Sequence, residues 1–312
     1  MKNEIDISIV IPVYNEENSL PELHERLVKA LEQTGKTLEI LYVDDGSTDS
    51  SPGILKEFHK KDRKTKILRL RHNYGQQSAL MAGFEYSKGN AVITLDADLQ
   101  NIPEDIPKFL EAISEGYDIV CGKRTKREDS FFKRKIPSFL ANGLVSLYTG
   151  KRFHDYGCGF RAFTRDMVKY ILDFGETGKE LLLLGMIGAK KIKEVDISHS
   201  GRKYGKSKYT FISLINLTMD IVTSYSTIPF IIVGFIGFSL FITGSAMSAY
   251  YLSIRFIFSI ITEIESRVML LTLIFLTMGL QLLILGFLGE YILRINQRTL
   301  KKPMFKIDFF LD

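Results

Sequence analysis

Tryptophan is absent from this chain of 312 residues, and cysteine occurs only at Cys121 and Cys158. Two cysteines do not make a disulfide framework, and in a cytosolic domain both are expected to be reduced thiols. The first residues, MKNEID, contain no apolar signal-peptide region, so the long N-terminal part is expected to stay in the cytosol. The net charge of +5 is accompanied by no basic helix or aromatic RNA-binding motif, which argues against a nucleic-acid partner.

Charged residues are missing from two long stretches, 221–254 and 268–289. Each stretch exceeds the ~20 apolar residues with which a helix crosses a bilayer, and each is rich in Ile, Leu, Phe and Gly. These stretches predict two transmembrane helices, at 229–252 and 268–292, within a membrane-anchor region that covers residues 228–312. Two short spans offer little surface for packing within one chain, so a homo-oligomer is a reasonable expectation.

Basic residues flank these stretches on one side of the membrane. They are Arg202, Lys203, Lys206 and Lys208 before the first stretch, and Arg294, Arg298, Lys301, Lys302 and Lys306 after the second. The connecting loop is neutral overall, so residues 1–210 and the C-terminal tail are both predicted to be cytosolic. Residues 131–148 and 211–227 are predicted to form helices that lie on the membrane surface, with packed domain helices as the alternative.

Residues 1–210 alternate between short apolar strands and amphipathic helices. Strands are predicted at 7–11, 38–43, 66–70, 91–95 and 118–121. Helices are predicted at 18–34, from the end of segment 44–47 to about residue 60, at about 75–87 and at about 104–115. This alternation predicts a mostly parallel α/β sheet with helices on both faces. Ligands bind beyond the carboxyl ends of strands in such sheets, where the polar strand ends 12–16, 44–47, 96–98 and 122–124 are expected to converge.

Two carboxylates, Asp96 and Asp98, follow the strand at 91–95 with a spacing that places them on the same side of an extended segment. About 4 Å apart, such charges repel by roughly 4 kcal/mol at an effective dielectric of about 20, so a cation is expected there. The oxygen ligands of Asp96, Asp98 and Gln100 suit Mg²⁺ or Mn²⁺ rather than zinc. Taken alone, the pattern also fits an acidic turn at a strand end.

Glycine-rich phosphate loops are absent: there is neither a Gly-x-Gly-x-x-Gly turn after the first strand nor a Gly-x-x-x-x-Gly-Lys-Ser/Thr loop. A phosphorylated ligand would therefore be held by metal and by Arg or Lys side chains. The candidate residues come from different strand ends, which a set of unrelated turns does not readily explain.

Six short segments stand in a characteristic order along the chain. They are IVIPVYNEE at 9–17, VDDGS at 43–47, LDADLQ at 95–100, DYGCGFR at 155–161, RKYGKSKY at 202–209 and LGEYI at 288–292. The first three resemble family 2 glycosyltransferases with the GT-A fold. The others narrow the resemblance to polyprenyl-phosphate glycosyltransferases, which include dolichol-phosphate mannosyltransferase and the bacterial undecaprenyl-phosphate sugar transferases. The resemblance covers nearly the whole chain.

The resemblance implies a role for each matching residue. The residues that would hold the nucleoside are Pro12, Tyr14, Glu16 and Asp45, and those for metal and diphosphate are Asp96, Asp98 and Gln100. Arg124 would lie near the phosphates, and Asp155 at the junction of sugar and acceptor. The residues that would meet the lipid phosphate are Arg202, Ser207 and Lys208. The loop at 72–77 lacks the Lys that the dolichol branch often carries, which favours the undecaprenyl branch and leaves open which loop residue touches the donor.

The implied reaction is an inverting, metal-dependent transfer of a sugar from a nucleotide-diphosphate sugar to a polyprenyl phosphate, at the inner membrane and for cell-envelope glycan modification. Uridine is favoured over guanosine as the nucleoside. A phosphate monoester has a second pKa near 6, so the acceptor is largely ionised at pH 7 and does not strictly need a general base. We therefore expect Asp155 to position the substrate more than to remove a proton.

Two alternatives stand beside this interpretation. A processive polysaccharide synthase of the same superfamily would use a Gln-x-x-Arg-Trp motif, which a chain without tryptophan cannot contain. A membrane-anchored protein that binds sugar nucleotides without turnover would be separated from the enzyme by a donor turnover assay. The sequence does not indicate which sugar is transferred.

Overall fold

The computed structural model describes residues 5–124, 155, 157–173, 181–198 and 305–312, together with single positions between 253 and 295. The chain divides into two compact units, one of Met1–Leu214 with Lys302–Asp312 and one of Ile215–Lys301. No helix in the described part of the chain is long and apolar enough to cross a membrane. The predicted interfacial segments lie outside the described residues, and so do most positions of the two predicted spans.

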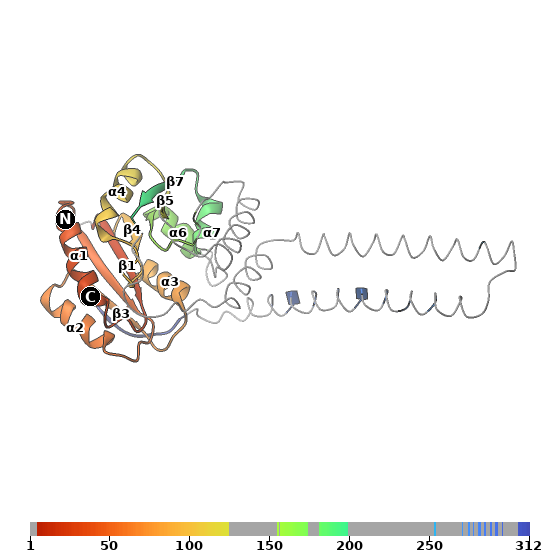
Figure 1. The fold of residues 1–312 in the computed structure, drawn as a ribbon, viewed down its shortest axis with the longest axis horizontal. Coiled ribbons are helices and arrows are strands. Elements are labelled where there is room, and N and C mark those ends of the chain that lie inside the picture. Colours follow the sequence, from red (N-terminus) through yellow and green to blue (C-terminus); the bar gives the residue numbers. More distant parts are fainter. Residues whose placement is uncertain are drawn as a thin grey trace. The chain divides into compact units, whose positions relative to one another are not determined.

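The first unit is built around an eight-stranded sheet in the order β7-β5-β6-β4-β1-β2-β3-β8 (Figure 1). The strands are β1 (Ile7–Val13), β2 (Leu38–Asp44), β3 (Thr65–Leu70), β4 (Ala91–Thr94), β5 (Ile119–Arg124), β6 (Arg161–Thr164), β7 (Ile192–Ile197) and β8 (Ile307–Leu311). β6 and β8 run antiparallel to their neighbours, and the other pairs are parallel. The prediction of a mostly parallel α/β sheet is confirmed.

Helices cover both faces of this sheet. They are α1 (Leu20–Glu32), α2 (Ser51–Lys61), α3 (Gln76–Tyr86), α4 (Ile106–Ser114) after the short η1 (Pro103–Asp105), α6 (Arg165–Asp173) and α7 (Leu181–Gly188). Side chains of α1, α2 and α4 share one core with Ile9 and Ile11 of β1. α3 packs on β1 and β2 and also contacts α6, and its Phe84 meets Phe163 of β6 edge-on.

The repeating leucines of α1 explain why this segment is a helix. Leu20, Leu23, Leu27 and Leu31 recur at the spacing of one helical face, and all four are buried. Pro21 stands in the first turn, where a missing backbone N–H has no cost, and its fixed φ favours the helical start. Local pattern and tertiary burial therefore agree for this element.

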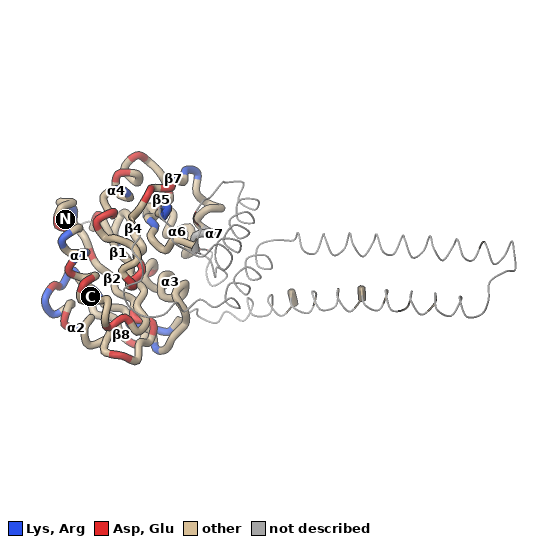
Figure 2. Tube along the Cα trace, in the orientation of Figure 1, with Lys and Arg blue, Asp and Glu red and all other residues tan. Residues whose placement is uncertain are grey.

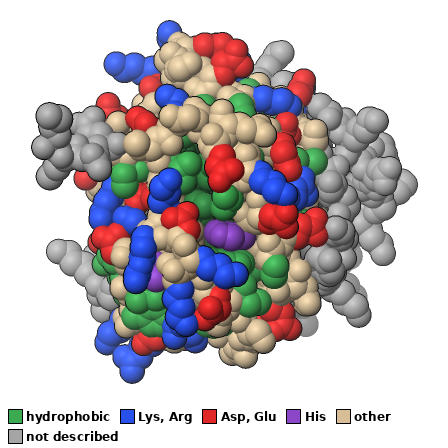
Figure 3. All heavy atoms as spheres, turned by 90° about the vertical axis from the view of Figure 1, so that its left-hand side faces the viewer, with side chains coloured by type: hydrophobic (Ala, Val, Ile, Leu, Met, Phe, Trp, Pro, Cys, Tyr) green, Lys and Arg blue, Asp and Glu red, His purple; other side chains and the backbone are tan. Residues whose placement is uncertain are grey.

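Positions of Lys and Arg and positions of Asp and Glu are both distributed along the trace of the first unit (Figure 2). On the face drawn in Figure 3, Lys and Arg side chains are interspersed with Asp and Glu. Arg26 forms a two-pronged ion pair with Glu104, with N–O distances of 2.9 and 2.8 Å. Exposed pairs of this kind contribute about 0–1 kcal/mol each, so the fold depends mainly on its buried core.

β8 is an edge strand supplied by residues that follow the second unit in the chain. It pairs antiparallel with β3, and the N–H of Arg71 donates to the carbonyl of Lys306 at 2.9 Å. Its aromatic side chains use both faces of the sheet: Phe309 packs against the core under α1 and α2, and Phe310 meets Tyr86 of α3 edge-on. These residues were predicted to lie in a cytosolic tail, because five residues with one charge give a weak strand signal.

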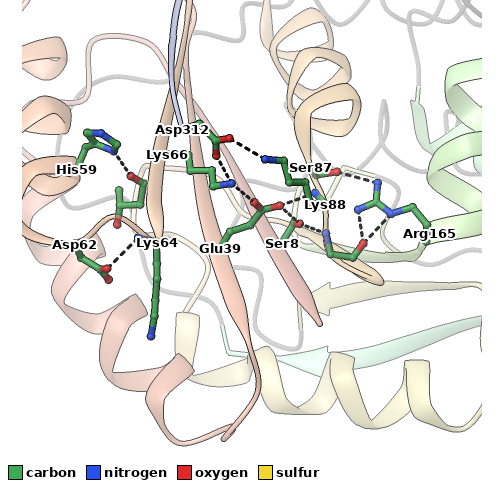
Figure 4. Close-up of polar contacts among 12 residues, drawn as sticks. Ser8, Glu39, His59, Asp62, Lys64, Lys66, Ser87, Lys88, Arg165 and Asp312 are labelled. Atoms are coloured by element: carbon green, nitrogen blue, oxygen red, sulfur yellow. Dashed lines mark hydrogen bonds and ion pairs between the residues drawn. The ribbon is translucent and has the colours of Figure 1, made fainter. Parts of the chain in front are cut away.

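A buried carboxylate organises the amino-terminal edge of the sheet (Figure 4). Glu39 accepts hydrogen bonds from the Ser8 hydroxyl at 2.5 Å and the Lys88 backbone N–H at 2.6 Å, and its second oxygen lies 3.0 Å from Lys66 Nζ. Asp312 lies between Lys66 and Lys88, with ion pairs to both. We call this cluster of Ser8, Glu39, Lys66, Lys88 and Asp312 the amino-edge latch, because its ion pairs connect the end of β8 to the rest of the sheet.

Candidate active site

The strand ends that the sequence analysis singled out lie together at the carboxyl edge of the sheet. β1, β2, β4 and β5 are parallel in the sheet and end at this edge. β6 is antiparallel to β4 and β5, so it begins at the same edge and brings residues 157–161 there. The topology alone therefore assembles the segments 12–16, 44–47, 96–100 and 155–161 around one site.

The loops after β1 and β2 are joined by hydrogen bonds. The N–H of Asn15 donates to Ser47 Oγ at 3.0 Å, and the N–H of Thr48 donates to Asn15 Oδ1 at 2.8 Å. The N–H of Glu16 donates to Ser51 Oγ at 3.0 Å. Asn15 has a φ of 55°, a left-handed conformation that Asn tolerates better than most residues. This pairing fixes the backbone that carries Pro12, Tyr14 and Glu16, and the sequence analysis did not foresee it.

Asp45 is a buried carboxylate that holds the loop after β3. Only 3% of it is exposed, and its two oxygens accept the backbone N–H groups of Tyr74 and Gly75 at 2.7 and 2.8 Å. Burial raises the pKa of Asp45 above its ordinary value, and the two N–H donors oppose that rise. A Cβ on Gly46 would lie 2.6 Å from the carbonyl carbon of His72, so glycine lets these two loops approach. The carboxylate is thus rigidly placed between two loops.

Residues 96–100 alternate between the core and the site. Ala97 and Leu99 are buried, whereas Asp96, Asp98 and Gln100 are half-buried. Leu99 has a φ of 61°, and the N–H of Gln100 donates to Asp98 Oδ1 at 3.2 Å, which closes a tight turn. Residues 97 and 98 thus form a turn, and not the extended segment that the sequence predicts, because the strand already ends at Thr94. In the described residues no three His, Cys, Asp or Glu side chains cluster as metal ligands. Two carboxylates and one amide within five residues still offer a set of hard oxygen donors that fits Mg²⁺ or Mn²⁺.

Arg124 and Asp155 form a buried, two-pronged ion pair. Arg124 Nε lies 2.6 Å from Asp155 Oδ2, and Arg124 Nη2 lies 2.7 Å from Oδ1. Asp155 is 4% exposed, and its own N–H donates to Glu194 of β7 at 3.3 Å. Both residues were predicted in the site from the sequence, but their contact was not. Planar guanidinium and carboxylate groups in this arrangement fix each other's orientation.

Gly159 brings the segment before β6 against Asp96. A Cβ at Gly159 would lie 2.3 Å from Asp96 Oδ2, so a larger residue there would displace this carboxylate from its observed position. The Thr94 hydroxyl donates to the Gly159 carbonyl at 2.7 Å and holds the segment in place. Gly159 therefore leaves room for the Asp96 carboxylate, a relation that only the folded structure reveals.

The cysteines are buried and unbonded to each other, as the sequence analysis expected. Burial raises the pKa of Cys121 to about 12 and the pKa of Cys158 to about 11. Both thiols are therefore protonated at neutral pH and poor nucleophiles. They contribute packing beside the site rather than chemistry.

The candidate residues for the lipid phosphate are not placed by the structure. Arg202, Ser207 and Lys208 lie outside the described residues. The candidates that the structure does bring to one edge are Pro12, Tyr14, Glu16, Asp45, Asp96, Asp98, Gln100, Arg124 and Asp155. Gln76 was missed: it opens α3 and its amide nitrogen donates to Asp96 Oδ1 at 2.7 Å. Its only signal in the sequence was its place in the loop after the third strand.

A mixed α/β sheet whose carboxyl edge carries these carboxylates and one arginine is the arrangement of a GT-A glycosyltransferase. Residues 8–172 match the family model described as glycosyl transferase family 2. The chain belongs to this family, and it is a glycosyltransferase.

Relatives are similar over almost the full length. The chain is 39% identical over 302 residues to an undecaprenyl-phosphate 4-deoxy-4-formamido-L-arabinose transferase of Proteus mirabilis, covering 96% of this chain and 92% of the relative. It is 42% identical over 301 residues to a protein of the same name from Pectobacterium atrosepticum, again covering 96% and 92%. The second unit is thus included in the similarity.

Solved structures share the fold at low identity. The glucosyl-3-phosphoglycerate synthase of Mycobacterium tuberculosis, crystallised with Mn²⁺, UDP-glucose and phosphoglyceric acid, matches with a TM-score of 0.51 at 16% identity. The match covers 71% of this chain and 78% of that one. A further mycobacterial protein matches with a TM-score of 0.52 at 18% identity, over 70% of this chain and 73% of the other. These matches establish the architecture of the sheet and its helices.

Proposed function

We propose that this enzyme transfers a sugar from a nucleotide-diphosphate sugar to undecaprenyl phosphate, with inversion at the anomeric carbon, to supply a lipid-linked sugar for cell-envelope glycan modification. The observation that carries the proposal is the identity of 39–42% over 96% of the chain to relatives named as undecaprenyl-phosphate transferases. In this reaction a phosphate oxygen of the lipid bonds to C1 of the sugar. The bond from C1 to the donor diphosphate breaks, and the nucleoside diphosphate leaves.

The donor would lie across the carboxyl edge of the sheet. Pro12, Tyr14, Glu16 and Asp45 are the residues proposed to hold the nucleoside, and their loops are already fixed by mutual hydrogen bonds. Asp96, Asp98 and Gln100 would hold Mg²⁺ or Mn²⁺ against the diphosphate. When bound, a divalent ion neutralises charge that develops on the leaving diphosphate. The Mn²⁺ and UDP-glucose in the mycobacterial synthase make a uridine donor and Mn²⁺ the first conditions to test.

Asp155 is proposed to act through Arg124. Both of its carboxylate oxygens bind the guanidinium, so neither is well placed to take a proton from the acceptor. The acceptor phosphate is also largely ionised at pH 7, because its second pKa is near 6. Asp155 would thus orient Arg124, which would contribute positive charge near the phosphates in the transition state.

The second unit is proposed to anchor the enzyme in the inner membrane through helices at 229–252 and 268–292, with both chain ends in the cytosol and an interfacial helix at 211–227. Several large apolar side chains are exposed at its described helical positions, namely Leu270, Ile274, Leu288, Tyr291, Ile292 and Ile295. Exposed apolar side chains at this spacing suit contact with lipid. Arg202, Ser207 and Lys208 would then meet the lipid phosphate near the membrane surface.

The test is a turnover assay with purified full-length protein, undecaprenyl phosphate in detergent or vesicles, and Mn²⁺ or Mg²⁺. A panel of nucleotide sugars would include the uridine donor of 4-deoxy-4-formamido-L-arabinose, the sugar named for the relatives. Lipid-linked product that appears only with metal and one donor supports the proposal. Donor hydrolysis without lipid product in every arm would instead point to another acceptor, and no turnover of any donor would favour a binding protein.

A further inference from the structure

Gln76 makes a contact that sequence reasoning left unassigned. It is the first residue of α3, it is exposed, and its Nε2 donates to Asp96 Oδ1 at 2.7 Å. A carboxylate can only accept hydrogen bonds, so the amide nitrogen must be the atom that faces Asp96. The contact therefore has one geometry, with the –NH₂ group directed at one carboxylate oxygen.

The backbone next to Gln76 is fixed by Asp45, one of the residues proposed to hold the nucleoside. The two residues before it, Tyr74 and Gly75, donate their N–H groups to the buried carboxylate of Asp45. Gly75 has a φ of 93°, which turns the chain sharply into α3. The side chain of Gln76 thus starts from a fixed point and spans from the Asp45 loop to Asp96.

Backbone also lies close to the Asp96 carboxylate. A Cβ at Gly159 would lie 2.3 Å from Asp96 Oδ2 and 2.6 Å from Oδ1, and the Gly159 carbonyl accepts a hydrogen bond from Thr94, the last residue of β4. Asp96 therefore has an amide donor at Oδ1 and the Gly159 backbone beside both of its oxygens. These contacts restrict the orientation of the carboxylate before any ligand arrives.

We propose that Gln76 is a positioning residue of the donor site, which orients the Asp96 carboxylate for a divalent cation and couples that carboxylate to the Asp45 loop. The proposal rests on the proposed function, because it assigns Asp96 to the metal–diphosphate site. Groups that hydrogen-bond to metal ligands set the ligand's direction, and their replacement typically lowers metal affinity or activity about 10- to 100-fold.

A purely structural role for Gln76 predicts a different outcome. Its side chain is exposed, so its burial contributes little to the stability of the fold. Loss of an exposed hydrogen bond changes the free energy of unfolding only slightly, because water replaces the lost partner. Metal affinity, rather than melting temperature, is thus the quantity that separates the two roles.

The experiment compares Gln76→Met with wild type in the full-length protein, by titrating Mn²⁺ without nucleotide and following free Mn²⁺ by electron paramagnetic resonance. Methionine keeps the length of the side chain and removes the donor. We expect Mn²⁺ affinity to fall about 10-fold, the lower end of the range for such groups because Gln76 is exposed. Gln33→Met, at the exposed C-terminal end of α1, is the matched control and should bind Mn²⁺ like wild type.

A double-mutant cycle tests whether Gln76 acts through Asp96. Adding Gln76→Met to Asp96→Asn should lower Mn²⁺ affinity no further than Asp96→Asn alone, because the oriented carboxylate is already gone. Additive losses, or wild-type affinity in Gln76→Met, would overturn the inference and leave the proposed function standing. A wild-type protein that binds no Mn²⁺ and turns over no donor would overturn both.

Discussion

The two ends of the sheet both carry buried carboxylates, and the proposed active site lies at the carboxyl end. At the amino edge, Glu39 is 1% exposed and is surrounded by a hydroxyl, a backbone N–H and the Lys66 ammonium. At the carboxyl edge, Asp45 and Asp155 are also buried, whereas Asp96 and Asp98 at the same edge are half-buried. Burial and charge alone do not separate a structural network from an active site, whereas strand direction does.

The largest difference between the two ends should be seen with Asp98→Asn, which should lower activity and leave stability nearly unchanged. We expect the rate of lipid-linked product formation to fall about 1,000-fold, because the amide removes a charge that is proposed to hold the metal and diphosphate in the transition state. The melting temperature should stay near that of wild type, since Asp98 is half-buried beside an open site. Asp308→Asn, at an exposed position of β8, is the control for charge removal and should retain full activity. Full activity of Asp98→Asn would remove Asp98 from the site.

The reverse pattern is expected at the amino edge. Glu39→Gln leaves Lys66 without one buried partner, and breaking a buried ion pair costs about 3–5 kcal/mol of stability. Taking about 3 kcal/mol, the melting temperature should fall by roughly 6–12 °C, measured by calorimetry. The turnover number per folded molecule should not change at low temperature. A loss of turnover without a loss of stability would show that the two ends are not independent.

An intermediate effect on the rate is expected at Arg124 and Asp155, which form an ion pair within the proposed active site. Asp155→Asn keeps the shape of the side chain but leaves one guanidinium edge without a charged partner, so Arg124 should lose its fixed orientation. A misplaced charge of this kind costs about 100-fold in rate. If Asp155 were instead a general base, raising the pH should partly restore the rate of the variant. A rate ratio between variant and wild type that is constant with pH supports positioning.

The smallest effect is expected from Asp312→Asn in the amino-edge latch. Hydrogen bonds from Lys66 and then Lys88 lower the pKa of Asp312 below its ordinary value, so its stabilising effect requires the carboxylate form. That effect is fully present above the ordinary Asp pKa of about 3.9 and is lost as the pH falls through the lowered value. Because the side chain is half exposed, the variant should lose less than about 1 kcal/mol at pH 7. Denaturant unfolding should show wild type and variant converging in acid.

The sequence predicts most of the sheet because its signals are local. The leucines of α1 and the apolar runs of β1, β2 and β4 are each sufficient to identify an element, and alternation implies the parallel topology. The carboxyl-edge location of Asp45, Asp96 and Arg124 follows from that topology without any knowledge of distances. These predictions needed only the order of segments along the chain.

The remaining features depend on distances between segments, which no local pattern encodes. The pairing of Arg124 with Asp155 joins residues 31 positions apart, and Gln76 reaches Asp96 across 20. β8 was not predicted, because its five residues alone do not indicate a strand. It becomes a strand by pairing with β3 at the edge of the sheet. The steric need for Gly159 likewise appears only when the Asp96 carboxylate is placed beside it.

β8 also has a consequence for the order in which the protein can be made. Lys88 contacts Asp312 across 224 positions of sequence, and β3 pairs with a strand that is translated after the whole of the second unit. The edge of β3 must therefore remain open while roughly 230 residues leave the ribosome, although β1 to β4 can pair early during synthesis at about 5–20 residues per second. Completion of the catalytic sheet is consequently a late event, which can only follow synthesis of the second unit.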